Sequence, residues 1–167
     1  ESPVSYSTRK SWKFFWIVDP LDGTKDFIKH NDEFTVNIAL VNNNRPELGV
    51  VYAPALDECW WAMKGKGAYK DNQKIYNKSK RKNLISSDSR FHSTEDTKLF
   101  LKKNNIDKVV RYGSSLKLCK LAEGKIDIYP RLNGTKEWDT AATDIIVHES
   151  GCSLVNYETK QKLVYNK

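Results

Sequence analysis

The sequence is poor in the residues that build disulfide frameworks and soft metal sites. It has three cysteines and three histidines among 167 residues. Cys59, Cys119 and Cys152 are widely spaced in apolar surroundings and lack the paired spacing of a zinc site. We therefore expect free, buried thiols in a reducing compartment, which indicates a cytoplasmic location. The histidines are too scattered to form a metal site of their own.

Long apolar runs and targeting signals are missing as well. No stretch is long enough to cross a bilayer, and no segment has the pattern of a secretory signal peptide. Stable membrane insertion is therefore not expected. The composition, 39% hydrophobic and 11% aromatic, is typical of a globular protein with a real core.

Acidic residues are outnumbered by basic ones, which leaves a formal net charge of +7. Six of the basic residues fall within thirteen positions: Lys70, Lys74, Lys78, Lys80, Arg81 and Lys82. Such a cluster could follow a nucleic-acid backbone, but no zinc finger or other nucleic-acid module accompanies it. A solvated connecting loop is favoured, and no nucleic-acid partner is expected. A basic surface would still help to attract a small anion.

The hydrophobic pattern predicts two halves. In the first, alternating runs separated by turn residues predict an antiparallel sheet with strands at 13–18, 34–41, 48–53 and 59–63. From Leu84 onward, short strands at 84–85, 109–110 and 126–129 alternate with helices at 94–103 and 114–122. This alternation predicts a mixed α/β layer. The polar stretch 77–83 is the expected boundary between an N-terminal half, 1–83, and a C-terminal half, 84–167.

The most informative motif is Asp19-Pro20-Leu21-Asp22-Gly23-Thr24, which follows an apolar run that we expect to be a buried strand. Two carboxylates and a free carbonyl suit a hard divalent cation such as Mg²⁺. Pro20 stiffens the turn, Gly23 permits a tight bend, and Thr24 is expected to cap a short helix. A plain surface turn would use the same residue types for backbone reasons alone.

A second carboxylate motif lies at residues 137–142. The apolar residues that follow it recur at helical spacing and predict a buried helix, with Asp139 in the first turn. A negative charge there is favoured by the helix dipole, so that helix capping by itself would explain Asp139.

Together the two motifs resemble the magnesium-dependent, lithium-sensitive phosphatase superfamily that contains inositol monophosphatase, and most closely its 3′(2′),5′-bisphosphate nucleotidase branch. The matching segments, in the order of the family, are 16–28, 31–37, 48–54, 113–117, 122–131 and 138–142. The resemblance implies the layered αβαβα fold of the sugar phosphatases and two or three Mg²⁺ ions per site. It also implies that Asp19, Leu21 (through its carbonyl), Asp22 and Asp139 hold the metals.

The resemblance further implies hydrolysis by an activated water that Thr24 orients, with Asp19 and Asp22 also catalytic. The substrate phosphate would lie against Leu21, Asp22, Gly23, Thr24 and Asp139. The implied reaction removes the 3′-phosphate of adenosine 3′,5′-bisphosphate, giving AMP, as in sulfate assimilation. Inositol monophosphate or another sugar phosphate is the alternative substrate.

Substrate specificity is expected to depend on the start of the predicted helix 114–122. Ser114, Ser115 and Lys117 could bind the second phosphate or the ribose of a small phosphorylated nucleotide. The two serines would equally serve as helix caps. A homodimer remains open at this level.

The chain also departs from the family pattern at its ends. Family members are longer, so we expect a fragment that lacks N-terminal helices and a final strand. The family's water-activating glutamate falls at Glu1 or just before it, and both alignments stay open. A non-catalytic remnant that binds phosphate without hydrolysing it is therefore the second hypothesis.

Overall fold

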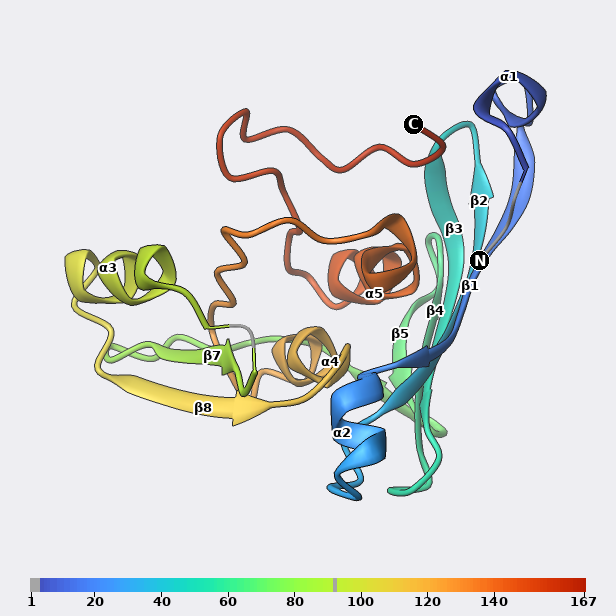
Figure 1. Ribbon diagram of the computed structural model, residues 1–167. Coiled ribbons are helices and arrows are strands. Elements are labelled where there is room, and N and C mark those ends of the chain that lie inside the picture. The colour runs from blue at the N-terminus through green and yellow to red at the C-terminus, as the bar shows by residue number, and fades with distance from the viewer. Residues whose placement is uncertain (1–3, 92) are drawn as a thin grey trace.

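The computed structural model describes residues 4–91 and 93–167, and most of the first half is one antiparallel sheet (Figure 1). A short helix, α1 (Tyr6–Arg9), precedes it. The sheet runs β1-β2-β3-β4-β5-β6 in chain order. Its strands are β1 (Phe14–Asp22), β2 (Thr35–Asn42), β3 (Arg45–Ala53), β4 (Glu58–Met63), β5 (Gly67–Lys70) and β6 (Gln73–Ile75). A short helix, α2 (Thr24–Ile28), connects β1 to β2. The predicted antiparallel sheet is confirmed, and β5 and β6 are strands beyond the four that the pattern indicated.

The second half supplies a parallel strand pair and three helices. The pair is β7 (Ile85–Ser89) and β8 (Lys108–Tyr112), joined by α3 (Glu95–Lys103). Two further helices follow, α4 (Leu116–Ala122) and α5 (Glu137–Glu149). The strand expected at 126–129 is wrong: it is reduced to a single bridge between Ser86 and Ile128.

The helices α4 and α5 lie between the two sheets (Figure 1). One hydrophobic cluster joins the six-stranded sheet to both helices, with Trp60, Cys119 and Ile146 fully buried in it. The backbones approach closely here: a Cβ on Gly49 of β3 would lie 2.3 Å from the Ala142 carbonyl oxygen of α5. A second cluster joins the same helices to β7 and β8 through Leu121 and Val147. The layered mixed α/β fold is thus confirmed.

Two expectations about burial are corrected. We expected a buried strand at the start of the first motif, but β1 is an edge strand of the sheet, and Phe14, Trp16 and Val18 are 62%, 59% and 48% exposed. Apolar character alone does not distinguish a strand covered on both faces from one covered on a single face. Of the three free thiols only Cys119 is buried, and the other two are half-buried.

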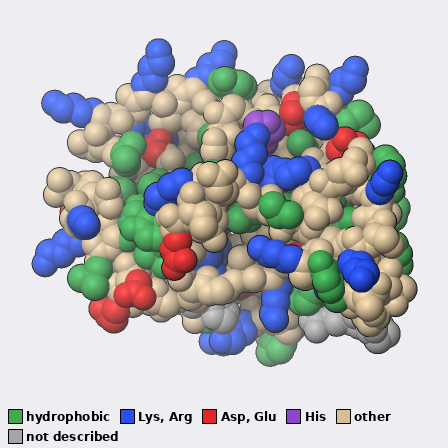
Figure 2. All heavy atoms as spheres, turned by 90° about the horizontal axis from the view of Figure 1, so that it is seen from above, with side chains coloured by type: hydrophobic (Ala, Val, Ile, Leu, Met, Phe, Trp, Pro, Cys, Tyr) green, Lys and Arg blue, Asp and Glu red, His purple; other side chains and the backbone are tan. Residues whose placement is uncertain are grey.

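Within the described residues, no helix is both long and apolar enough to cross a membrane. Figure 2 shows Lys and Arg side chains spread over one face of the molecule, with acidic side chains among them.

Candidate metal centre

The two aspartates of the first motif are brought together by an irregularity in β1. In a regular strand, residues three positions apart point to opposite faces. Here Asp19 pairs with Asn37 and Asp22 with Thr35, so that three residue steps on β1 match two on β2. The extra residue is a β-bulge, which redirects the side chain that follows it. Pro20, which cannot donate to a ladder, is tolerated because β1 is an edge strand.

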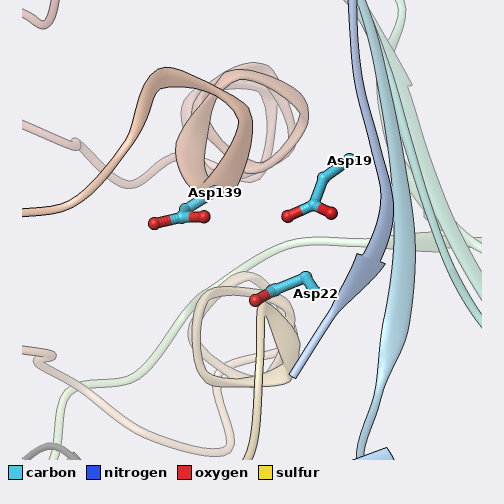
Figure 3. Close-up of side chains that lie close together, drawn as sticks. All are labelled: Asp19, Asp22 and Asp139. Atoms are coloured by element: carbon cyan, nitrogen blue, oxygen red, sulfur yellow. The ribbon is translucent and has the colours of Figure 1, made fainter. Parts of the chain in front are cut away.

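The third carboxylate comes from the second half of the chain. Asp139 lies in the first turn of α5, and the three side chains point toward one another (Figure 3). Asp19, Asp22 and Asp139 each offer an oxygen, and these atoms lie within 4.8 Å of one another. Asp139 Oδ2 also accepts hydrogen bonds from Thr135 Oγ1 (2.6 Å) and the Lys136 backbone N–H (2.9 Å). The predicted cap role of Asp139 and its place in the acidic cluster therefore coexist.

The pKa of Asp22 reflects the burial of its carboxyl group and the charge of its neighbours. Burial raises the pKa of its carboxyl group, and the nearby Asp139 carboxylate raises it further. A hydrogen bond from Ser115 Oγ, 2.7 Å from Asp22 Oδ2, acts in the opposite direction. Lys117, also nearby, lowers the pKa of Asp22 as well.

The segment after Asp22 turns sharply into α2. Gly23 has φ +86°, in the left-handed region, and is the N-cap of this helix. Thr24, which we expected to be the cap, is instead its first helical residue and is exposed. Its hydroxyl donates to the Leu21 carbonyl oxygen at 3.4 Å. The Leu21 N–H in turn donates to Asp19 Oδ1 at 3.1 Å, which keeps the motif compact.

The cluster forms part of the wall of a cavity of about 1160 Å³. All the described residues of the predicted site line this cavity: Asp19, Leu21, Asp22, Gly23, Thr24, Ser114, Ser115, Lys117 and Asp139. Burial of the Lys117 ammonium lowers its pKa to about 8, and its Nζ donates to the carbonyl oxygens of Tyr112 and Ser114. The Ser114 hydroxyl is buried without a hydrogen-bond partner. Ser115 is the N-cap of α4, but its side chain makes no capping bond.

An ion-pair clamp next to the cluster was missed by the sequence reasoning. Arg90 pairs with Asp26 (3.2 Å) and Glu33 (2.8 Å), and Glu33 Oε2 also accepts the Gly113 N–H (2.7 Å). These contacts tie the start of the Ser114 loop to the connection between β1 and β2. Asp26 is only 4% exposed. No local signal distinguishes such a buried acid from a surface one, because its partner lies 64 positions away.

The residues present fit a divalent metal ion. Three converging carboxylates repel one another, and a hard cation with oxygen ligands relieves that repulsion. Glu1, the further ligand expected from the sequence, lies outside the described residues.

The fold and site define a class: a layered mixed α/β protein with an acidic cluster, able to hold a metal ion, in the wall of a large cavity. Comparison with known proteins makes this specific. The model of the inositol monophosphatase family matches residues 1–167, and the chain belongs to that family.

Among curated relatives, the chain is 41% identical to the 3′(2′),5′-bisphosphate nucleotidase CysQ of Salmonella typhimurium over 164 residues. It is 40% identical to CysQ of Escherichia coli strain K12. In both cases 96% of this chain matches 66% of the relative, so the chain spans just under two thirds of their length.

Solved structures agree with this placement. CysQ from Bacteroides thetaiotaomicron superposes with a TM-score of 0.92 at 40% identity, covering 100% of this chain and 70% of that one. An inositol monophosphatase from Anabaena superposes with a TM-score of 0.78 at 28% identity, covering 90% and 65%.

Proposed function

We propose that this chain carries the core of a Mg²⁺-dependent phosphatase that removes the 3′-phosphate of adenosine 3′,5′-bisphosphate. The observation that carries the proposal is the convergence of three carboxylates, from two distant segments, at the wall of a large cavity. The names of the relatives support the substrate class, because both curated relatives are bisphosphate nucleotidases.

In this proposal Asp19, Asp22, Asp139 and the Leu21 carbonyl would hold Mg²⁺. When bound, Mg²⁺ would make water a better nucleophile and neutralise charge on the transferred phosphoryl group. Thr24, whose hydroxyl is exposed beside Leu21, orients the attacking water. Backbone N–H groups of Gly23 and Thr24 would donate hydrogen bonds to the phosphate oxygens.

The second phosphate of the substrate lies against the start of α4. Lys117 supplies a buried positive charge there, and Ser114 supplies a hydroxyl that no other described group uses. Ser115 belongs to the same wall, although its hydroxyl already donates to Asp22. A substrate with two phosphates would use both the carboxylate cluster and this basic wall, whereas a monophosphate would use the cluster alone.

The test is phosphate release by the purified chain in Mg²⁺, comparing adenosine 3′,5′-bisphosphate with inositol 1-phosphate, with and without lithium. We expect selective, lithium-sensitive release from the nucleotide. Preferential phosphate release from inositol 1-phosphate would instead identify the alternative substrate class. Binding of the nucleotide without release would identify a non-catalytic phosphate-binding protein.

A further inference from the structure

A chain of three hydrogen bonds runs from the interior of the sheet to Asp22. The Thr35 hydroxyl donates to Asn37 Oδ1 at 3.0 Å, and Asn37 Nδ2 donates to Ser115 Oγ at 2.9 Å. Ser115 Oγ donates to Asp22 Oδ2 at 2.7 Å. We name these three residues and the carboxylate they reach the Asp22 relay.

The direction of the relay is fixed by its end. Ser115 Oγ has two acceptors within reach, Asp22 Oδ2 at 2.7 Å and the Asp139 carbonyl oxygen at 3.2 Å. An ionised carboxylate only accepts hydrogen bonds, and as the nearer and charged acceptor it takes the single hydroxyl proton of Ser115. Ser115 Oγ must then accept a hydrogen bond from the side-chain amide of Asn37, and Asn37 Oδ1 accepts one from the Thr35 hydroxyl. Asn37 Nδ2 also lies 3.5 Å from Asp22 Oδ2, so that its donor side faces the carboxylate.

The relay is buried, which makes its geometry rigid. Thr35, Asn37 and Ser115 are 0%, 1% and 4% exposed. Thr35 and Asn37 occupy the inward positions of β2, in line with Ala39 and Val41, which are fully buried. Two polar side chains in this apolar row are costly unless each finds partners, and their side-chain hydrogen bonds are made within the relay.

A purely local role for Ser115 does not account for these contacts. It occupies the N-cap position of α4, yet its side chain makes no capping hydrogen bond. Its hydroxyl reaches β1, 93 positions earlier in the chain. The relay therefore connects β2, α4 and β1 at one carboxylate.

We propose that Ser115, Asn37 and Thr35 are positioning residues for Asp22. The bond to Oδ2 fixes the plane of the carboxyl group, so that Oδ1 would remain for a cation held together with Asp19 and Asp139. The inference rests on the proposed function, since it concerns the same metal site. It assigns the Ser115 hydroxyl to Asp22 and leaves Ser114 and Lys117 to the substrate.

The experiment measures binding of Mn²⁺ alone to the chain, from the electron paramagnetic resonance signal of the free ion. Ser115→Ala removes the donor to Asp22, and we expect the dissociation constant for Mn²⁺ to rise roughly 10-fold to 100-fold, as for other groups that orient metal ligands. Ser87→Ala is the matched control: Ser87 is also a fully buried serine, and its hydroxyl has no hydrogen-bond partner. It should bind Mn²⁺ as the wild type does.

A double-mutant cycle tests whether the residues act as one unit. Asn37→Ala should also weaken Mn²⁺ binding, and the Ser115→Ala/Asn37→Ala double variant should be no weaker than Ser115→Ala alone. Thr35→Val, which keeps the shape of the side chain, should raise the dissociation constant at least roughly 3-fold, although Asn37 and Ser115 lie between it and Asp22 in the relay. Thr35→Val tests whether the relay affects metal binding even where Ser115→Ala does not fold.

Unchanged Mn²⁺ affinity in the folded Ser115→Ala or Thr35→Val variant would overturn the relay. If the increase in the dissociation constant of the double variant equalled the product of the increases in the two single variants, Ser115 and Asn37 would act independently, and this too would overturn the relay. A wild type that binds Mn²⁺ but hydrolyses no phosphate ester would overturn the proposed function and leave the relay to be decided by these affinities. A wild type that binds no Mn²⁺ would overturn both.

Discussion

At the scale of single residues, the site is governed by the cost of placing like charges together. Burial and Asp139 both raise the pKa of Asp22, whereas the Ser115 and Asn37 hydrogen bonds and the nearby Lys117 lower it. Lys117 shows the reverse case, a cation whose pKa falls to about 8 because it is buried. Both shifts are typical of functional sites, where charge is held for a ligand at some expense of stability.

Replacing Asp22 by Asn tests its role as a ligand. Asn keeps the shape and the contact with Ser115 but removes the negative charge, so we expect turnover to fall at least about 100-fold with the fold intact. Turnover is measured as phosphate release, and the fold by circular dichroism. Asp107→Asn, at an exposed acid outside the cavity, is the control. Full activity in Asp22→Asn would refute the assignment.

Lys117 predicts a pH dependence. Its ammonium carries charge below pH about 8 and loses it as the pH rises through that value, while the substrate phosphates stay anionic. We expect kcat/KM to fall roughly 10-fold or more above pH 8, since a hydrogen bond to a charged group contributes roughly 1.5–3 kcal/mol. Lys117→Met should be low throughout and lack this step. An identical pH profile in the variant would show that another group is responsible.

At the scale of elements, the β-bulge in β1 and the turn at Gly23 decide where the carboxylates point. If the three steps from Asp19 to Asp22 were regular, the two side chains would lie on opposite faces of the strand. Gly23 then takes a left-handed conformation in a tight space, where an added Cβ would lie 2.9 Å from Ser114 Cβ. The sequence predicted the need for glycine here, but not the neighbour that crowds it.

Gly23→Ala should therefore destabilise the fold by more than backbone strain alone. Left-handed φ costs a non-glycine residue roughly 1–2 kcal/mol, and the contact with Ser114 adds to this. Gly65→Ala is the matched control, because Gly65 has φ +73° and nothing within 4 Å of an added Cβ. Free energies of unfolding come from denaturant titrations. An equal decrease in the free energy of unfolding of both variants would mean that the Ser114 loop shifts to accommodate the added Cβ without further destabilisation.

At the scale of the whole molecule, the site exists only where the two halves of the chain pack together. The first half supplies Asp19 and Asp22 from the sheet, and the second supplies Asp139 from α5, which packs across the middle of that sheet. An ion pair between the half-buried Arg45 on β3 and the buried Asp144 on α5 joins the same two layers. A cation that binds the three carboxylates should therefore stabilise the global fold.

Mg²⁺ should raise the melting temperature of the chain, and EDTA should remove the increase. At a Mg²⁺ concentration 100 times the dissociation constant, the stabilisation is about 2.7 kcal/mol, which corresponds to a shift of roughly 5–10 °C. Differential scanning calorimetry measures it, with Asp22→Asn as the variant expected to lose most of the shift. An equal shift in both proteins would place the stabilising ion elsewhere.

The sequence by itself determined the antiparallel sheet and the buried helix α5, because hydrophobic period and turn chemistry are local properties. The members of the carboxylate cluster were predicted from the spacing within residues 19–24 and from the family resemblance, which adds Asp139. The alternation at 34–41 predicted a half-buried strand but not that Thr35 and Asn37 lie on its buried face.

Only the tertiary structure decided how these elements act together. The β-bulge that turns Asp22, the exposure of one face of β1 and the partner of the Ser115 hydroxyl all depend on contacts between residues far apart in the chain. The Arg90 clamp and the lowered pKa of Lys117 arise in the same way, from burial and charges that neighbouring elements supply. Such interactions leave no periodic signal, since their distance in sequence is set by the fold.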